Sequence, residues 1–211
     1  MRLRPAVSVA TLLVLTLGAA AGNAGTPPSC NLMQAPAGDA SDQVNGVHLG
    51  PNEPELDIVS GDVASDARSV TTVIRVLRLG SATEALERQG IYRFFFRLGA
   101  APGTAVTIAT RGLDGERFQV LLPSEGQSTV DTSLPATGTF DIPRNEVRVT
   151  VPIEVLTGGR HGSRRTFLSQ LAADTYRGVG TGRAAASTSM DQASTTRRYL
   201  AGSPSCVSVG H

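Results

Sequence analysis

The sequence has no lysine and no tryptophan, and its 211 residues include only two cysteines and three histidines. All nineteen basic residues are arginines, which is typical of a GC-rich genome and indicates no particular function. Two cysteines exclude a small fold that is held together by several disulfides. The histidines are His48, His161 and His211, so a three-histidine metal site would have to use the last residue of the sequence.

Familiar catalytic motifs are also missing. There is no Gly-x-Ser-x-Gly turn, no His-Glu-x-x-His helix and no phosphate-binding loop. A pair of carboxylates for glycoside hydrolysis depends on a geometry that the sequence does not give, so a hydrolase is the third interpretation. We expect a protein that is not an enzyme.

Long hydrophobic runs are confined to the N-terminus. Two arginines precede an apolar run over 6–21, and small residues follow it, which predicts a signal peptide that is cleaved after Ala21 or Ala24. The expected organisation is a signal peptide over 1–24 and a single β-sandwich domain over 25–211. No later stretch is apolar enough to span a membrane, so we expect a secreted, extracellular protein without a transmembrane segment after cleavage.

The two cysteines, Cys30 and Cys206, lie near the two ends of the predicted mature chain. Export would deliver them to an oxidising compartment, where a disulfide persists and exposed thiols are a liability. We predict that they pair, and two free thiols are the alternative. The chain-entropy model gives so long a loop roughly 5 kcal/mol of stabilisation as an upper limit.

Charge is nearly balanced overall. Without the leader and its two arginines, seventeen arginines face eighteen carboxylates, so we expect no general attraction to nucleic acid or to anionic membranes. The distribution is uneven, because residues 25–67 hold seven acids and no arginine while residues 68–211 hold all seventeen arginines. Ion pairs between these two parts are the simplest expectation.

Apolar and polar residues alternate with a period of two, which predicts strands with one buried face. Strands are expected over 68–79, 91–98, 105–110, 117–122, 127–133, 145–156 and 196–202, with a hairpin at Asp114-Gly115. Residues 164–178 permit a helix or a strand, and residues 178–195 are expected to form a long loop. Eight to ten such strands predict an all-β fold, a two-sheet antiparallel β-sandwich of the jelly-roll or immunoglobulin-like kind.

The clearest strand is NEVRVTVPIEVL. It would place Val147, Val149, Val151, Ile153 and Val155 on one face. Pro152 points to the other face and lacks a donor, which predicts an exposed edge or a bulge there.

The segments APAGDA, PELDIVSGDVASD, TTVIRV, YRFFF and MDQASTTRRYLAGSPSC together resemble a secreted β-sandwich domain of high-GC Gram-positive bacteria. The early GD and LDI pattern is also similar to the opening of DOMON-like and family 9 carbohydrate-binding-type sandwiches. The resemblance covers nearly the whole predicted mature chain and implies a sandwich that binds sugars, haem or calcium. The chain departs from that group because it lacks tryptophan.

The stretch PNEPELDIVSGDVASD, residues 51–66, carries five carboxylates and no cation. Calcium binds six to eight oxygens, which loop acids and the acids of a strand end can supply. The candidate metal ligands are Asp39, Asp42, Asp57, Asp62 and Asp66. The spacing in DASDQVNG does not fit the EF-hand loop, and carboxylates that are solvated or paired with strand arginines are the alternative.

Two further patterns suggest ligand binding. The glycine-rich segment TGGRHGSRR presents Arg160, His161 and Arg164, whose donors would suit a sulfate or an acidic glycan; a solvated turn is the alternative. Tyr176 and Tyr199 are flanked by arginines and are the candidates for exposed rings that stack on sugars, with packing in the core as the alternative.

These patterns favour a secreted, non-catalytic binding module for carbohydrate or a cell-envelope glycan. The alternative is a calcium-stabilised structural or protein-interaction domain at the cell surface.

Overall fold

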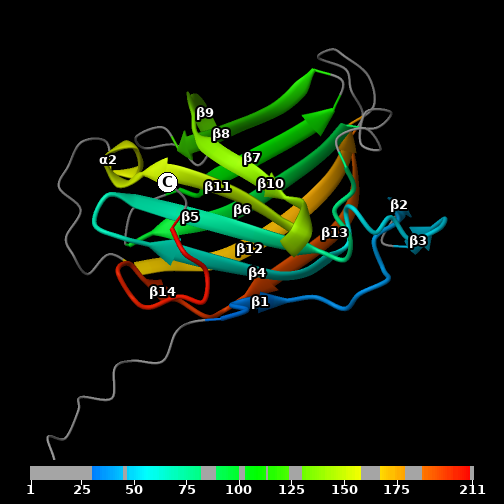
Figure 1. The fold of residues 1–211 in the computed structure, drawn as a ribbon, viewed down its shortest axis with the longest axis horizontal. Helices are drawn as coiled ribbons and strands as arrows, with labels where there is room; N and C mark the ends of the chain where they lie inside the picture. Colours follow the sequence, from blue (N-terminus) through cyan, green and yellow to red (C-terminus); the bar gives the residue numbers. More distant parts are fainter. Residues whose placement is uncertain are drawn as a thin grey trace, which may run out of the picture.

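A computed structural model describes residues 30–44, 47–81, 89–99, 103–112, 114–123, 130–157, 167–178 and 187–209. In these residues the chain forms two antiparallel sheets that pack face to face, with a small hairpin at one end (Figure 1). The predicted all-β sandwich is therefore confirmed. The predicted signal peptide over 1–24 lies outside the described residues.

One sheet has five strands, in the order β1 (Met33–Gln34), β4 (Ile58–Ser65), β5 (Ser69–Val76), β11 (Glu146–Pro152) and β10 (Thr137–Asp141). The other has seven, β13 (Ser187–Thr195), β12 (Phe167–Gly178), β6 (Gln89–Leu98), β7 (Ala105–Gly112), β8 (Gly115–Pro123) and β9 (Val130–Pro135), with β14 (Tyr199–Leu200) paired to β12. The hairpin consists of β2 (Asp42–Val44) and β3 (Val47–Leu49).

The described residues thus form fourteen strands, which is more than the eight to ten expected. Four of them, β1, β2, β3 and β14, are only two or three residues long, and the other ten agree with the prediction. The short helical turns η1 (Ile142–Arg144) and α2 (Ile153–Leu156) are the remaining regular elements of the described residues. No helix among these residues is long and apolar enough to cross a membrane.

The core lies between the two sheets and follows from the period of two, because successive side chains of a strand point to opposite faces. The five-stranded sheet contributes Ile58, Val63, Ile74, Val76, Val147, Val149 and Val151, and the seven-stranded sheet contributes Tyr92, Phe94, Phe96, Leu168, Leu171 and Ala173. Among the polar contacts between the two sheets is that of Thr72 Oγ1 with Thr107 Oγ1, at 2.7 Å. Each hydroxyl also lies within reach of a backbone carbonyl oxygen, Thr72 of Val149 at 3.4 Å and Thr107 of Phe94 at 3.5 Å, so both buried groups have partners.

The structure decides three sequence-based expectations about the C-terminal half. Residues 167–178, for which the sequence permitted helix or strand, form β12. The expected loop over 178–195 was wrong for residues 187–195, which form β13 beside β12. The strand expected to continue to Val155 ends at Pro152, and Ile153 lies in the short helix α2. A proline has no N–H for the ladder, which is consistent with a strand end there.

The hairpin predicted at Asp114-Gly115 joins β7 to β8, with Gly112 opposite Gly115. Gly115 has a φ of +87°, a backbone conformation that only glycine adopts without strain.

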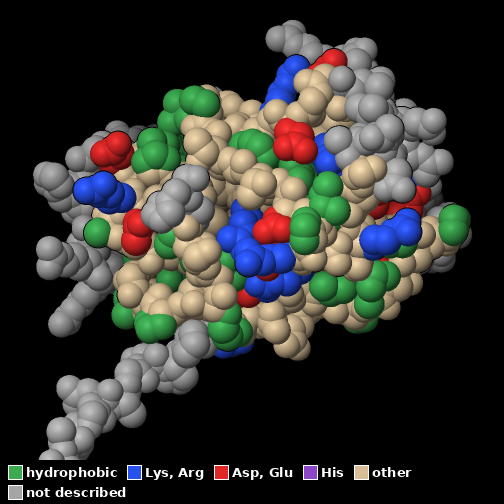
Figure 2. All heavy atoms as spheres, in the orientation of Figure 1, with side chains coloured by type: hydrophobic (Ala, Val, Ile, Leu, Met, Phe, Trp, Pro, Cys, Tyr) green, Lys and Arg blue, Asp and Glu red, His purple; other side chains and the backbone are tan. Residues whose placement is uncertain are grey.

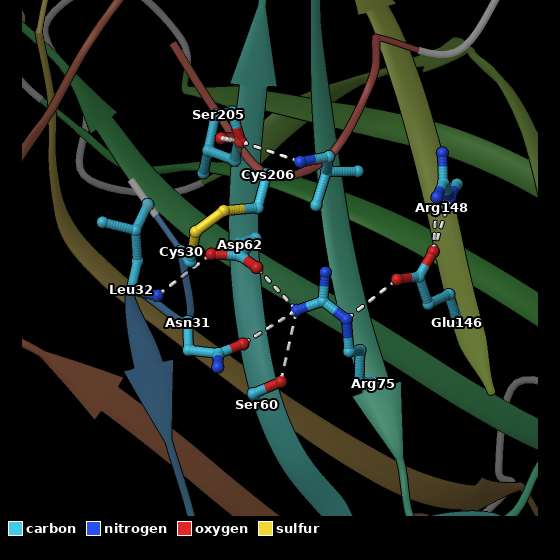
Figure 3. A network of polar contacts seen from close by, with 12 residues as sticks. Cys30, Asn31, Leu32, Ser60, Asp62, Arg75, Glu146, Arg148, Ser205 and Cys206 are labelled. Carbon is cyan, nitrogen blue, oxygen red and sulfur yellow. Dashed lines mark hydrogen bonds and ion pairs between the residues drawn. A yellow bond between two sulfur atoms is a disulfide. The ribbon is translucent and has the colours of Figure 1, made fainter. Parts of the chain in front are cut away.

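The predicted disulfide between Cys30 and Cys206 is present, with a Cα–Cα distance of 5.3 Å. It ties the start of the described chain to the C-terminal tail, and both lie on the outer face of the five-stranded sheet (Figure 3). Val207 packs there against Ala64 and Val73, and Ser205 Oγ donates to the carbonyl oxygen of Val63 at 2.9 Å. The tail therefore covers part of this outer face.

Candidate metal centre

Three carboxylates from distant parts of the sequence meet, and one of them belongs to the loop that joins β1 to the β2–β3 hairpin (Figure 1). Asp39 lies in the loop after β1, Asp57 directly precedes β4, and Asp191 lies on β13. One oxygen from each carboxylate lies within 4.8 Å of the others. A side chain of the seven-stranded sheet, one from the segment before β4 and one from the N-terminal loop therefore converge.

Asp57 is held by donors from two loops. The backbone N–H of Gly38 donates to Asp57 Oδ2 at 2.7 Å, and Asn52 Nδ2 donates to the same oxygen at 2.8 Å. Gly38 has a φ of +95°, which a residue with a side chain rarely adopts. These bonds fix the carboxylate through Oδ2 and leave Oδ1 without a donor.

Asp191 connects the two sheets. Its Oδ2 accepts the backbone N–H of Ile58 at 2.6 Å, and its Oδ1 accepts the N–H of Gln192 at 2.6 Å. Ile58 begins β4 in the five-stranded sheet, whereas Asp191 belongs to the seven-stranded sheet. The orientation of the Asp191 carboxylate is therefore set by backbone groups of both layers.

The segment that carries Asp57 is anchored on the seven-stranded sheet. Thr175 Oγ1 donates to the carbonyl oxygen of Leu56 at 2.6 Å, and the Tyr92 hydroxyl donates to that of Glu55 at 3.0 Å. Burial raises the pKa of Tyr92, so its hydroxyl stays protonated and remains a donor. An ion pair between Arg177 and Glu53 adds a third link.

Buried oxygens without partners are the most telling feature of this site. Asp39 Oδ1 and Asp57 Oδ1 are buried and have no hydrogen-bond partner, and the same holds for Oδ1 of Asn52, which donates to Asp57. Asp57 as a whole is 0% exposed. A buried polar atom without a partner costs about 1 to 3 kcal/mol, and more when it is charged. A cation between these oxygens would remove that cost.

The pKa of Asp191 reflects the same crowding. It is raised from 3.8 to about 6 in all: burial raises it most, the two backbone N–H bonds lower it, and the nearby carboxylates of Asp39 and Asp57 raise it. In the absence of a cation, the folded protein thus holds a proton on Asp191 more tightly than the unfolded chain does.

The donor set indicates the kind of ion. Carboxylate and amide oxygens without nitrogen or sulfur ligands suit hard cations such as Ca²⁺ and Mg²⁺. Ca²⁺ tolerates irregular geometry, whereas Mg²⁺ requires a nearly ideal octahedron. The three carboxylates come from two loop residues and one strand residue, and so irregular a set of ligands fits Ca²⁺ better than Mg²⁺.

Of the five acids predicted as metal ligands, the structure brings Asp39 and Asp57 together. Asp62 instead accepts the backbone N–H of Leu32 at 3.0 Å and pairs with Arg75 at 2.5 Å. Asp66 accepts N–H groups of the turn between β4 and β5, from residues 68 and 69, both at 2.7 Å. Asp42 lies on β2, and its side chain is outside the described part of the chain.

Sequence reasoning missed Asp191 because it lies in a stretch of small residues that was expected to be a loop. The strand STSMDQAST has almost no large apolar side chains, so its alternation is hard to read. Among the side chains of this strand that the structure describes, those of Asp191 and Ala193 are buried. The sequence signal for a buried acid was that Asp191 stands two positions before an apolar residue, Ala193, and therefore on the same face of a strand.

The predicted ligand-binding residues have separate outcomes. Arg160, His161 and Arg164 lie outside the described residues, so the anion loop stays a prediction. Tyr176 is half-buried on the outer face of the seven-stranded sheet, where the guanidinium of Arg93 lies 4.1 Å from its ring centroid. Asp174 fixes that guanidinium with two hydrogen bonds of 2.7 Å.

Tyr199 is not an exposed ring, which corrects the sequence-based expectation. It is fully buried, and its hydroxyl accepts a bond from Ser65 Oγ at 3.1 Å and donates to the carbonyl oxygen of Ser203 at 2.8 Å. It therefore fastens the C-terminal segment to β4 and has no face available for a sugar.

The outer face of the five-stranded sheet carries a ladder of alternating charge across β4, β5 and β11 (Figure 3). Arg75 lies between Asp62 and Glu146, with a bond of 2.8 Å to the latter, and Arg148 donates to Glu146 at 2.9 Å. Figure 2 shows basic and acidic side chains together near the middle of this face. Burial would lower the pKa of Arg75, but its bonds to the two acids outweigh burial and raise it.

The pairing expected between the acidic N-terminal part and the later arginines is confirmed at two places, Asp62 with Arg75 and Glu53 with Arg177. The acids of the metal centre differ from these. Among the described residues, neither Asp39 nor Asp57 forms an ion pair with an arginine.

Comparison of the chain with protein-family models, with curated proteins and with solved structures gave no match.

Proposed function

We propose that the protein is an exported, non-catalytic β-sandwich module that binds calcium through Asp39, Asp57 and Asp191. The observation that carries this proposal is the pair of buried carboxylate oxygens, Asp39 Oδ1 and Asp57 Oδ1, that have no hydrogen-bond donor and lie beside a third carboxylate. Export is supported by the Cys30–Cys206 disulfide, since such bonds persist in oxidising compartments.

The ion would crosslink separate segments of the chain. Its ligands come from the loop after β1, from the segment before β4, and from β13, so binding joins the N-terminal segment to the edge of the seven-stranded sheet. It would also offset the repulsion among three carboxylates that each have an oxygen within 4.8 Å of the others. Calcium binding and folding stability should therefore be tightly linked.

The size of the effect follows from mass action. Calcium sites of extracellular modules have dissociation constants of about 10⁻⁴ to 10⁻³ M. At about 5 mM calcium, such a site would stabilise the fold by about 1 to 2.3 kcal/mol. In a chain of this size that corresponds to a rise in melting temperature of about 2 to 9 °C.

Thermal unfolding tests the proposal. We expect calcium to raise the melting temperature at pH 7.5 relative to protein in chelator, and we expect magnesium at the same concentration to raise it less. An equal melting temperature in calcium and in chelator would contradict the proposal. Asp114→Asn is a suitable control, because Asp114 is an exposed turn residue, and this variant should keep the full response.

A further inference from the structure

The metal centre has a buried neighbour that carries no charge, Thr175 of β12. Thr175 is 0% exposed, and it lies directly opposite Asp191 in the ladder between β12 and β13. Residues that lie directly opposite each other in an antiparallel pair have their side chains on the same face, with Cβ atoms about 4.5 to 5.5 Å apart. The Thr175 hydroxyl and the Asp191 carboxylate are therefore neighbours on one face of the seven-stranded sheet.

These two side chains hold the chain on both sides of Asp57. Thr175 Oγ1 donates to the carbonyl oxygen of Leu56 at 2.6 Å. Asp191 Oδ2 accepts the backbone N–H of Ile58, also at 2.6 Å. The residue before Asp57 and the residue after it are thus each bonded to one member of the same cross-strand pair. These two bonds set the position of the Asp57 backbone relative to Asp191.

The ladder is irregular at this point. Asp191 lies opposite Thr175 and Ser189 lies opposite Tyr176, so β13 takes up one extra residue beside Asp191. A β-bulge of this kind bends the strand and changes the direction of nearby side chains. Regular pairing alone therefore does not fix the direction of Asp191. Its bond to Ile58 does so, and Thr175 holds the segment to which Ile58 belongs.

Two further contacts hold the same segment. The carbonyl oxygen of Asp57 accepts the N–H of Leu77 at 2.8 Å, and the Tyr92 hydroxyl donates to the carbonyl oxygen of Glu55 at 3.0 Å. Loss of the Thr175 hydroxyl would therefore loosen the segment without releasing it. The effect on a bound ion should be a weaker affinity and not a complete loss of binding.

On the basis of the calcium site proposed above, we propose that Thr175 is a positioning residue of this site, with Tyr92 as a second anchor. Neither hydroxyl needs to touch the ion, because both act on the backbone that carries Asp57. Groups that orient metal ligands typically change metal affinity by about 10- to 100-fold when they are removed. Since other contacts remain, we expect the lower end of this range for Thr175.

Calorimetric titration of calcium into chelator-treated protein tests the role of Thr175. Thr175→Val removes the hydroxyl and keeps the branched shape of the side chain, whereas Thr175→Ser keeps the hydroxyl. At a temperature well below the melting temperature of each variant, we expect Thr175→Val to raise the dissociation constant for calcium about tenfold. Thr175→Ser should bind calcium with nearly the wild-type constant.

Thr72→Val is the matched control for a purely structural effect. Thr72 is also a buried threonine, but its hydroxyl bonds to Thr107 and not to the segment that carries Asp57. Both valine variants lose a buried hydroxyl contact, so both should melt at a lower temperature than the wild type in chelator. Only Thr175→Val should weaken calcium binding.

An unchanged dissociation constant in Thr175→Val would overturn the inference, and so would an equal rise in Thr72→Val. If Thr175→Val does not fold, Tyr92→Phe takes its place, because it removes the bond to Glu55 and keeps the ring in the core. Tyr92→Phe should also raise the dissociation constant, and an unchanged value would then overturn the inference. A wild-type protein that binds no calcium would instead refute the proposed function.

Discussion

Replacing Asp57 by asparagine removes one charge from the metal centre without changing the shape of the side chain. The asparagine Oδ1 can accept the two bonds that Asp57 Oδ2 now accepts from Gly38 and Asn52, at 2.7 and 2.8 Å. Its amide nitrogen then takes the place of Asp57 Oδ1, the buried oxygen without a donor, and can donate to a neighbouring carboxylate. We therefore expect this variant to be more stable than the wild type in chelator and less stable in calcium.

The pKa of Asp191 sets the scale of the gain. It is raised from 3.8 to about 6, first by burial and then by Asp39 and Asp57. A shift of this size corresponds to about 3 kcal/mol as an upper limit. Because burial is the largest cause, removal of one neighbouring charge should return about 1 kcal/mol, which raises the melting temperature by about 2 to 4 °C.

Thermal unfolding at pH 7.5, followed by circular dichroism, is the assay for this variant. Wild type, Asp57→Asn and the control Asp114→Asn are compared with chelator and with about 5 mM calcium, a concentration that saturates most extracellular calcium sites. The order of stability of wild type and Asp57→Asn should reverse between the two conditions. A variant that is destabilised in chelator and still gains the wild-type increment from calcium would refute the reasoning.

Three other predictions concern the protein outside this variant. In chelator, protonation of Asp191 stabilises the fold, because the pKa of this group is about 6 in the folded protein and 3.8 without the fold. This contribution is complete below about pH 4 and is lost as the pH rises through 6. The free energy of unfolding should therefore fall between about pH 4 and pH 6, and an unchanged free energy over this range would contradict the assignment. Replacing both cysteines of the disulfide by serine should lower the free energy of unfolding by about 2 to 5 kcal/mol, measured with denaturant. An unchanged denaturant midpoint would show that the disulfide does not stabilise the fold. Arg75→Met removes the cation that buried Asp62 and Glu146 share and leaves Glu146 with Arg148 alone, which should cost about 3 to 5 kcal/mol. A loss below about 1 kcal/mol would mean that the charge ladder contributes little to stability.

The sheets could be predicted because their burial pattern is local. In β6, Tyr92, Phe94 and Phe96 are buried, whereas Arg93, Phe95 and Arg97, which alternate with them in the sequence, are only half-buried. Where the alternation lacks large side chains, as in residues 187–195, the sequence gives no comparable signal. The strand forms there because β12 offers a partner along its whole length.

The metal centre could be predicted only in part, for a related reason. Asp39 and Asp57 stand out in an acidic segment, but so does Asp62, whose neighbour Arg75 becomes its partner only when β4 pairs with β5. Asp191 lies 134 residues after Asp57 in the chain, and only the packing of the two sheets brings them together. Tertiary contacts of this kind leave no spacing in the sequence that could be read.

Titration calorimetry of calcium into chelator-treated protein at pH 7.5 tests the central claim most directly. We predict binding of one ion per chain with a dissociation constant of about 10⁻⁴ to 10⁻³ M, and loss of this binding in Asp191→Asn. Binding that is absent up to about 10 mM calcium, well above that range, would contradict the claim, and so would binding that Asp191→Asn leaves unchanged.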